Sequence, residues 1–250
     1  MTQSSSDVRA WLHTPMGAGL RARERPLVAE ALEQVFGLQL MQVGAWGAPE
    51  LFLDHARTTR RMLVDALPGP GVAMRCDPSQ LGLAAGSVDA LLLPHTLELH
   101  EEPHDVLREA ARVLAGEGRL IVLGFNPHGL WGARRVVSHG RFPAGVRRFI
   151  SEGRLRDWLA LLGFEMESSR RYGYQLPLHG SAAAGGRLEV LGARFWPRLS
   201  AGYLLVARKR VYTFTPARLA WSRKRAVVGG LVEPMTRSAS LSANRDRSAA

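Results

Sequence analysis

The chain has 250 residues, is 46% hydrophobic and carries a net charge of +11 at neutral pH. This hydrophobic content is typical of a globular domain rather than a disordered chain. The only cysteine is Cys76, which excludes an intrachain disulfide bond and a multi-cysteine metal site. No apolar run approaches the roughly 20 residues of a membrane-spanning helix, and the N-terminus lacks the apolar stretch of a secretory signal, so we expect a cytoplasmic protein with no membrane span.

The positive charge comes almost entirely from arginine, because Lys209 and Lys224 are the only lysines. Such a surplus permits anionic partners, nucleic acids among them, without establishing them. Part of it lies in residues 211–250, a basic stretch rich in arginine, serine and alanine. Because this stretch has little apolar periodicity, we expect a largely disordered tail.

The N-terminal segment, residues 1–37, is expected to contain one helix. Residues 1–10 are polar, and we expect them to be frayed. From Leu20 to Phe36, apolar residues recur at three- and four-residue spacing, and Gly37 follows as a stop signal. The pattern predicts an amphipathic helix that packs on the domain.

Short apolar runs then alternate with turns and helical patterns. Leu38–Val43 is the first expected strand, and a glycine-containing turn, Gly44 to Gly47, follows it. The next predicted elements are a short helix at Pro49–Arg57 and strands at Arg60–Ala66 and Val72–Cys76.

The central stretch, Ser87–Asn126, has the clearest pattern. Val88–Leu93 and Arg119–Phe125 are apolar runs typical of buried strands, and the residues between them have a helical apolar face that Gly116 and Gly118 end. A strand, helix and strand joined in this way predict a right-handed crossover in a parallel sheet. We expect the two strands to be adjacent, with these four residues buried: Leu91, Leu93, Ile121 and Leu123.

The C-terminal part begins with a basic, irregular insertion at 126–154, in which aromatic residues lie among arginines. This mixture can bind phosphates and stack bases, or it can be a solvated face with its apolar side packed inward. A helix at Glu152–Gly163 and a strand at Phe164–Ser168 come next. A long loop, Gly173–Pro197, precedes the last strand, Tyr203–Ala207.

These segments together resemble a known family. SVDALLLPHTLE and LREAARVLAGEGRLIV are similar to the fourth strand, helix and fifth strand of class I S-adenosylmethionine-dependent methyltransferases, most closely the type 11 methyltransferase domain. The resemblance extends over residues 38–210. It implies an α/β fold, a Rossmann-like sheet of seven mostly parallel strands with helices on both faces and the last strand antiparallel. It also implies S-adenosyl-L-methionine as the methyl donor.

The turn after the first strand stands where this family has its glycine-rich cofactor loop. The resemblance therefore implies that Gly44, Trp46 and Gly47 contact the donor. The loop departs from the family pattern, because Gln42 stands where an acid is expected and Trp46 where a second glycine is expected. Loss of the acid weakens the expectation that the amino-acid end of the donor is tightly bound.

Three further residues are candidates for binding the donor. Asp65 lies near the spacing at which an acid meets ribose hydroxyls in dinucleotide folds, although an exposed loop aspartate would look the same. Asp77 resembles the family's acid that faces the adenine amino group. His95 follows the fourth strand and is either a donor or acceptor contact or an uninvolved surface histidine. A metal site formed by His95, His100 and His104 is not expected, because their spacing matches no known site.

Three functions remain open from the sequence. The first is a methyltransferase that acts on an unknown acceptor, with a small molecule favoured, by in-line displacement that needs no recognisable catalytic residue. The second is a catalytically silent protein of the same fold with a regulatory role, suggested by the altered glycine loop. The third is a protein directed to nucleic acid through its basic insertion and tail.

Overall fold

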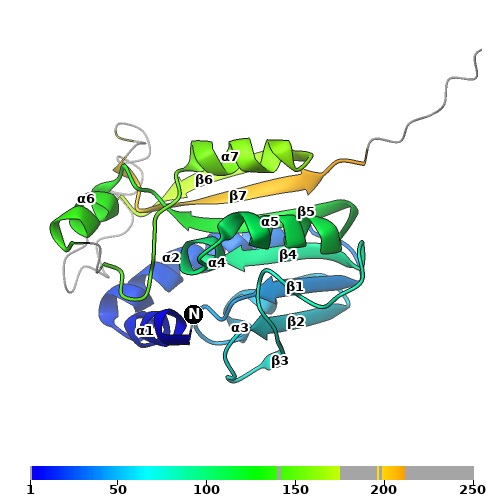
Figure 1. Cartoon of the computed structure of the whole chain (residues 1–250), viewed down its shortest axis with the longest axis horizontal. Helices are drawn as coiled ribbons and strands as arrows, with labels where there is room; N and C mark the ends of the chain where they lie inside the picture. Colours follow the sequence, from blue (N-terminus) through cyan, green and yellow to red (C-terminus); the bar gives the residue numbers. More distant parts are fainter. Residues whose placement is uncertain (1, 140–141, 175–195, 197–198, 212–250) are drawn as a thin grey trace, which may run out of the picture. The chain divides into compact units, whose positions relative to one another are not determined.

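The core of the protein is one sheet of seven strands in the order β3-β2-β1-β4-β5-β7-β6 (Figure 1). The computed structural model describes residues 2–139, 142–174, 196 and 199–211. Every pairing between neighbours is parallel except those of β7, which runs antiparallel to both β5 and β6. This confirms the expected class I methyltransferase-like α/β fold. The strands are β1 (Gln39–Val43), β2 (Arg60–Asp65), β3 (Val72–Arg75), β4 (Val88–Pro94), β5 (Leu114–Phe125), β6 (Phe164–Tyr172) and β7 (Gly202–Lys209).

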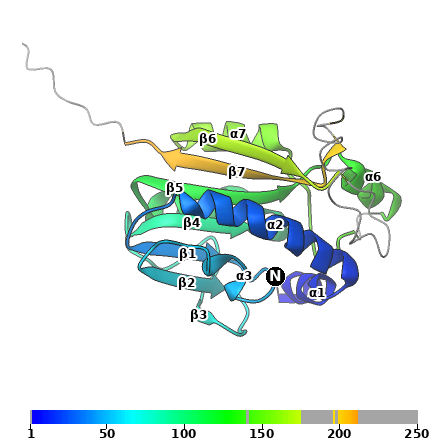
Figure 2. The same cartoon turned by 180° about the vertical axis from the view of Figure 1, so that it is seen from behind.

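Helices cover both faces of this sheet. Figure 1 shows α5 and α7 over one face, and Figure 2 shows α2 and α3 over the other. Because successive side chains of a strand point to opposite faces, each strand feeds two separate apolar cores. The helices are α1 (Thr2–Leu12), α2 (Pro15–Glu33), α3 (Glu50–Leu53), α4 (Thr96–Leu99), α5 (Pro103–Val113), α6 (Leu130–Val137) and α7 (Glu152–Leu161).

The central crossover is formed by β4, α5 and β5. The four residues expected to be buried are all fully buried, and β4 and β5 are neighbours, as predicted. The end of the helix was predicted wrongly, however. Helix α5 ends at Val113, and β5 begins at Leu114, so Gly116 and Gly118 lie inside the strand, where the β4–β5 register shifts. A glycine inside a strand marks such an irregularity as readily as it ends a helix.

The N-terminal segment holds two helices instead of one. The expectation that the first ten residues are frayed is wrong for residues 2–10, because they belong to α1 and Val8 is buried in the same apolar core as Leu20 and Val28 of α2. Helix α2 begins earlier than predicted, at Pro15, because the Thr14 hydroxyl accepts a hydrogen bond from the Gly17 N–H. Proline at the first helical position and a threonine cap explain this start.

The basic insertion, 126–154, contains helix α6 and extended chain, and several of its arginines make contacts within the protein. Arg135 donates hydrogen bonds to the carbonyls of Phe142 and Arg147, and Arg134 lies over the Phe142 ring. These contacts match the packed interpretation of the insertion better than a free phosphate-binding surface.

Two expected segments lie almost wholly outside the described residues: the loop from Gly173 to Pro197 and the tail at 211–250. Among the helices that the structure describes, none combines the length and apolar character needed to span a membrane.

Candidate functional site

The sheet has a topological switch point between β1 and β4. From β1 the chain moves outward to β2 and β3, then returns to build β4 and β5 on the other side. Ligands of open α/β sheets bind outside the carboxyl ends of the strands at such a point. The Gly44–Gly47 turn follows β1 there, and His95 follows β4.

The turn after β1 needs its two glycines. Both have left-handed backbone angles, with φ of +95° at Gly44 and +90° at Gly47. A Cβ on Gly44 would lie 2.9 Å from the Thr96 hydroxyl oxygen, and one on Gly47 would lie 2.8 Å from Arg21 Nη1. Side chains of the protein itself therefore lie close to the backbone of this turn at both glycines.

Asp65 ends β2 and is joined to this turn. Its Oδ2 accepts a hydrogen bond of 2.6 Å from the Ala45 N–H, and its Oδ1 accepts one from Leu67 N–H. Arg9 of α1 lies 3.2 Å from the same Oδ2 and donates to the carbonyls of Leu67 and Pro68. The acid expected at a ribose is thus beside the glycine turn, but it is already paired with a cation from the N-terminal helix.

Asp77 follows β3 at the same edge of the sheet. Its Oδ1 accepts hydrogen bonds from the backbone and hydroxyl of Ser79 and lies 3.1 Å from His100 Nε2. Burial raises the pKa of Asp77, but the bonds from Ser79 and His100 outweigh burial and lower the pKa below its usual value. Asp77 is therefore an ionised acceptor whose side chain is 42% exposed.

His95 is the centre of a buried charged network. It is fully buried and has a left-handed backbone angle (φ 56°), which is uncommon outside glycine. Its Nε2 lies 3.0 Å from Glu24 Oε1 of α2, and its Nδ1 lies 2.8 Å from Glu98 Oε2 of α4. Burial alone would lower the pKa of His95, yet the two carboxylates raise it to about 9. His95 is therefore an imidazolium held between two acids, not an uninvolved surface histidine.

The two acids have further partners. Glu24 accepts hydrogen bonds from Trp46 Nε1 at 2.6 Å and from the Tyr172 hydroxyl at 2.9 Å. Glu98 accepts one from the Phe125 N–H, and burial raises the pKa of Glu98. The network therefore joins α2, the glycine turn, β4, β5 and the end of β6.

Trp46 belongs to this network. Its ring stacks on His95 with a centroid distance of 4.4 Å, and only 1% of the residue is exposed. The side chain that replaces the family's second glycine thus points into the interior at the switch point, where it occupies space beside His95.

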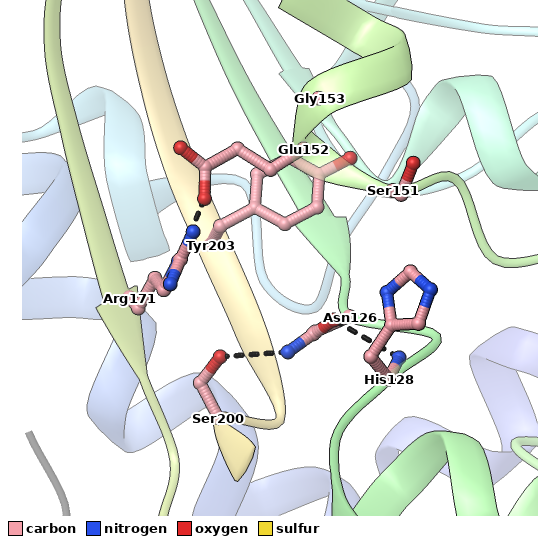
Figure 3. Close-up of a pocket in the computed structure, with 8 residues that line it drawn as sticks. All are labelled: Asn126, His128, Ser151, Glu152, Gly153, Arg171, Ser200 and Tyr203. Carbon is pink, nitrogen blue, oxygen red and sulfur yellow. Dashed lines mark hydrogen bonds and ion pairs between the residues drawn. The ribbon is translucent and has the colours of Figure 1, made fainter. Parts of the chain in front are cut away.

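Little free volume remains above Asp65. The cavity bounded by Gly44, Asp65 and Thr96 measures about 30 Å³, and Val8 and Arg9 of α1 also line it. A cavity of about 480 Å³ lies farther along the same edge, beyond β5 (Figure 3). In it, Asn126 donates to the Ser200 hydroxyl and Arg171 pairs with Glu152.

The histidines considered as metal ligands have separate partners. His100 forms a hydrogen bond with Asp77, while the His104 ring packs on the Trp158 ring with a centroid distance of 3.9 Å. Within the described part of the chain, no group of three or more histidine, cysteine or acidic residues could hold a metal ion.

Sequence reasoning missed Glu24, Tyr172 and Arg9, whereas Glu98 was expected, with His95 and His100, at the carboxyl end of the fourth strand. A signal for Glu24 was present, because the buried stripe of α2 runs at four-residue spacing through Leu20, Glu24, Val28 and Leu32. A carboxylate on an apolar stripe is a candidate for a buried, partnered acid. Tyr172 and Arg9 carried no such local signal.

Comparison with known proteins identifies the family. A family model described as a methyltransferase domain matches residues 36–122. The Escherichia coli K12 protein YafS, described as uncharacterized, is 35% identical over 209 residues, covering 82% of each chain. A Thermotoga maritima S-adenosylmethionine-dependent methyltransferase, described as a possible histamine N-methyltransferase, aligns with a TM-score of 0.57 at 17% identity, covering 76% of this chain and 91% of that one.

A second solved structure shows that this fold does not fix one reaction. The [4+2]-cyclase SpnF aligns with a TM-score of 0.53 at 21% identity, covering 75% of this chain and 80% of that chain. These structural likenesses establish the fold, while the match to the family model and the similarity to YafS establish the family. The chain belongs to the methyltransferase-domain family of class I fold.

Proposed function

We propose that the protein is an S-adenosylmethionine-dependent methyltransferase that binds its donor across the carboxyl ends of β1, β2 and β4. The observation that carries this proposal is the hydrogen bond between Asp65 and the Ala45 N–H, which joins the acid to a glycine turn beside the switch point. Asp65 would accept hydrogen bonds from the ribose. Asp77 would accept one from the adenine amino group, with buried Leu81 near it as an apolar wall.

Asp65 and Asp77 are acceptors of the kind that the donor's ribose and adenine need, but the cavity above Asp65 is too small for the donor. Ligand pockets for molecules of this size measure several hundred cubic ångströms, and the cavity above Asp65 measures about 30 Å³. Donor binding therefore requires α1 to withdraw Val8 and Arg9. The cavity of about 480 Å³ beyond β5 would then be the candidate acceptor site, because it opens on the same edge of the sheet.

When bound, the donor supplies an activated methyl group that leaves a neutral thioether on in-line displacement. The protein's part is to align the two reactants and to exclude water. His95 is unsuited to remove a proton from the acceptor, because it is charged and enclosed by Glu24, Glu98 and Trp46. An acceptor that loses its proton readily, or needs to lose none, fits this site best.

Calorimetry with S-adenosylhomocysteine and S-adenosylmethionine tests the proposal. We expect saturable binding of one donor per chain, weakened by Asp65→Ala, followed by methyl transfer in a screen of cell extracts with labelled donor. Absence of binding to both ligands would overturn the proposal for this chain.

A catalytically silent protein of the same fold is the second candidate, favoured by the burial of Trp46. An indole beside a sulfonium can stabilise it, by roughly 0.5–2 kcal/mol. Here, however, the ring lies against His95 and donates to Glu24, so it fills the interior. If the native protein binds no donor and Trp46→Gly does bind it, Trp46 fills the donor site in the native chain, and the protein is catalytically silent. If the native protein binds the donor and Trp46→Gly binds it equally well or more weakly, the result favours the methyltransferase function.

A further inference from the structure

A third cavity, of about 440 Å³, shares Arg9 with the small cavity above Asp65. It is enclosed by α1, the start of α2, the end of the glycine turn and the turn after β2. Its charged and titratable lining consists of Arg9, His13, Arg21 and one acid, the exposed Glu50. Its volume falls within the range of small-molecule sites, so the cavity has room for a ligand and a surplus of positive charge.

Arg21 is the unusual member of this lining. No carboxylate among the described residues forms an ion pair with its guanidinium, and its one hydrogen bond runs from Nη2 to the Leu12 carbonyl at 3.1 Å. Its Nε is buried and has no hydrogen-bond partner within the part of the chain that the structure describes. A buried donor on a charged group is costly to leave unpaired, and most native proteins satisfy such groups.

The position of Arg21 depends on the glycine turn. A Cβ on Gly47 would lie 2.8 Å from Arg21 Nη1 and 2.9 Å from its Cδ, so only glycine lets the side chain lie against the turn. Arg9, in contrast, already has Asp65 and two carbonyls as partners. The uncompensated charge of the cavity is therefore concentrated on Arg21.

We propose that this cavity binds an anionic small molecule through Arg21, and that the group bound is a carboxylate or a phosphate. A guanidinium matches either group with paired, charge-assisted hydrogen bonds. Arg9 lines both this cavity and the small cavity above Asp65, so a bound anion competes with Asp65 for Arg9. Occupation of the cavity thus favours release of the acid proposed to bind ribose.

The site itself does not depend on methyl transfer, and its first test uses no donor. Inorganic phosphate is titrated against the full chain at constant ionic strength, with chloride as the reference, and binding is followed by calorimetry and thermal unfolding. We expect saturable binding whose dissociation constant rises about tenfold or more in Arg21→Gln, from the loss of a charge-assisted bond. Arg25→Gln is the matched control, because Arg25 lies on the same helix, is exposed and bonds to His55.

Two sources could supply the anion, and a second arm separates them. S-adenosylhomocysteine carries an amino-acid carboxylate, and 5′-methylthioadenosine has the same nucleoside and thioether without it. If Arg21→Gln weakens only S-adenosylhomocysteine, the anion is the carboxylate of the donor product. If both ligands are unaffected while phosphate binding depends on Arg21, the anion belongs to a separate carboxylic acid or phosphate ester.

The proposal is overturned if Arg21→Gln binds phosphate and S-adenosylhomocysteine as tightly as the native chain, or if Arg25→Gln weakens phosphate binding equally. Arg21→Lys keeps the charge without the planar fork and serves if the glutamine variant fails to fold. It should bind phosphate with an intermediate constant. Failure of the native chain to bind any donor would refute methyl transfer. The titration with inorganic phosphate would then decide by itself whether this cavity binds an anion.

Discussion

Replacing Glu24 with alanine should lower the free energy of unfolding by about 3–5 kcal/mol, the range found when one partner of a buried ion pair is removed. Glu24 is fully buried and receives hydrogen bonds from Trp46, His95 and Tyr172. The substitution leaves three buried donors without their acceptor, one of them on a charged imidazolium. Because each unsatisfied group costs roughly 1–3 kcal/mol, water that enters the vacated space can offset only part of the loss.

The chain offers a matched control on the same helix. Glu30 pairs with Arg170, but these side chains are 50% and 53% exposed. An exposed pair of this kind contributes about 0–1 kcal/mol, so Glu30→Ala should be nearly neutral. The two substitutions remove the same side chain from α2 and differ in burial and partners.

Urea unfolding followed by circular dichroism measures both variants, provided that the slope with denaturant stays unchanged. Glu24→Gln should fall between alanine and the native chain, because it keeps the volume and one acceptor but loses the charge. If Glu24→Ala costs no more than Glu30→Ala, the buried network does not hold α2 on the sheet and the reasoning is refuted.

Three further predictions follow from the same geometry. The pKa of His95 is about 9 in the fold and 6.5 in the unfolded chain. Its contribution to stability is therefore complete below pH 6.5 and is lost as pH rises through 9. Urea unfolding at a series of pH values should show that the free energy of unfolding falls by up to about 3 kcal/mol over this range, and by less in Glu24→Gln. An equal fall in the native chain and in Glu24→Gln would contradict this prediction. Asp77→Asn keeps an acceptor for Ser79 and should weaken S-adenosylhomocysteine binding by ~1–2 kcal/mol in calorimetry; unchanged affinity would place the adenine elsewhere. Arg9→Ala removes the partner of Asp65 and should raise the affinity for the same ligand about fivefold, the equivalent of one partly buried ion pair of about 1 kcal/mol, whereas equal or weaker binding would show that α1 does not compete with the donor.

The fold could be predicted because its signals are local. The strands of a parallel sheet are buried on both faces, so β4 and β5 appear as continuous apolar runs, and α5 between them shows a single apolar side. Element ends were less certain: the glycines expected to stop α5 lie inside β5. Helix α1 was missed because its buried apolar residues, Val8, Trp11 and Leu12, all lie in its C-terminal half and follow a polar stretch.

The sequence by itself placed Gly44, Gly47, Asp65, Asp77 and His95 at the carboxyl ends of successive strands, since that depends only on strand order and parallel pairing. It left open whether each residue is exposed, buried or already paired. That was decided by partners distant in the chain: Glu24 meets Trp46, His95 and Tyr172 across 22, 71 and 148 residues. A carboxylate on a helix looks the same in the sequence whether it faces water or an imidazolium. Only the packing of α2 against the sheet excludes water from Glu24, and only the placement of α1 brings Arg9 to Asp65.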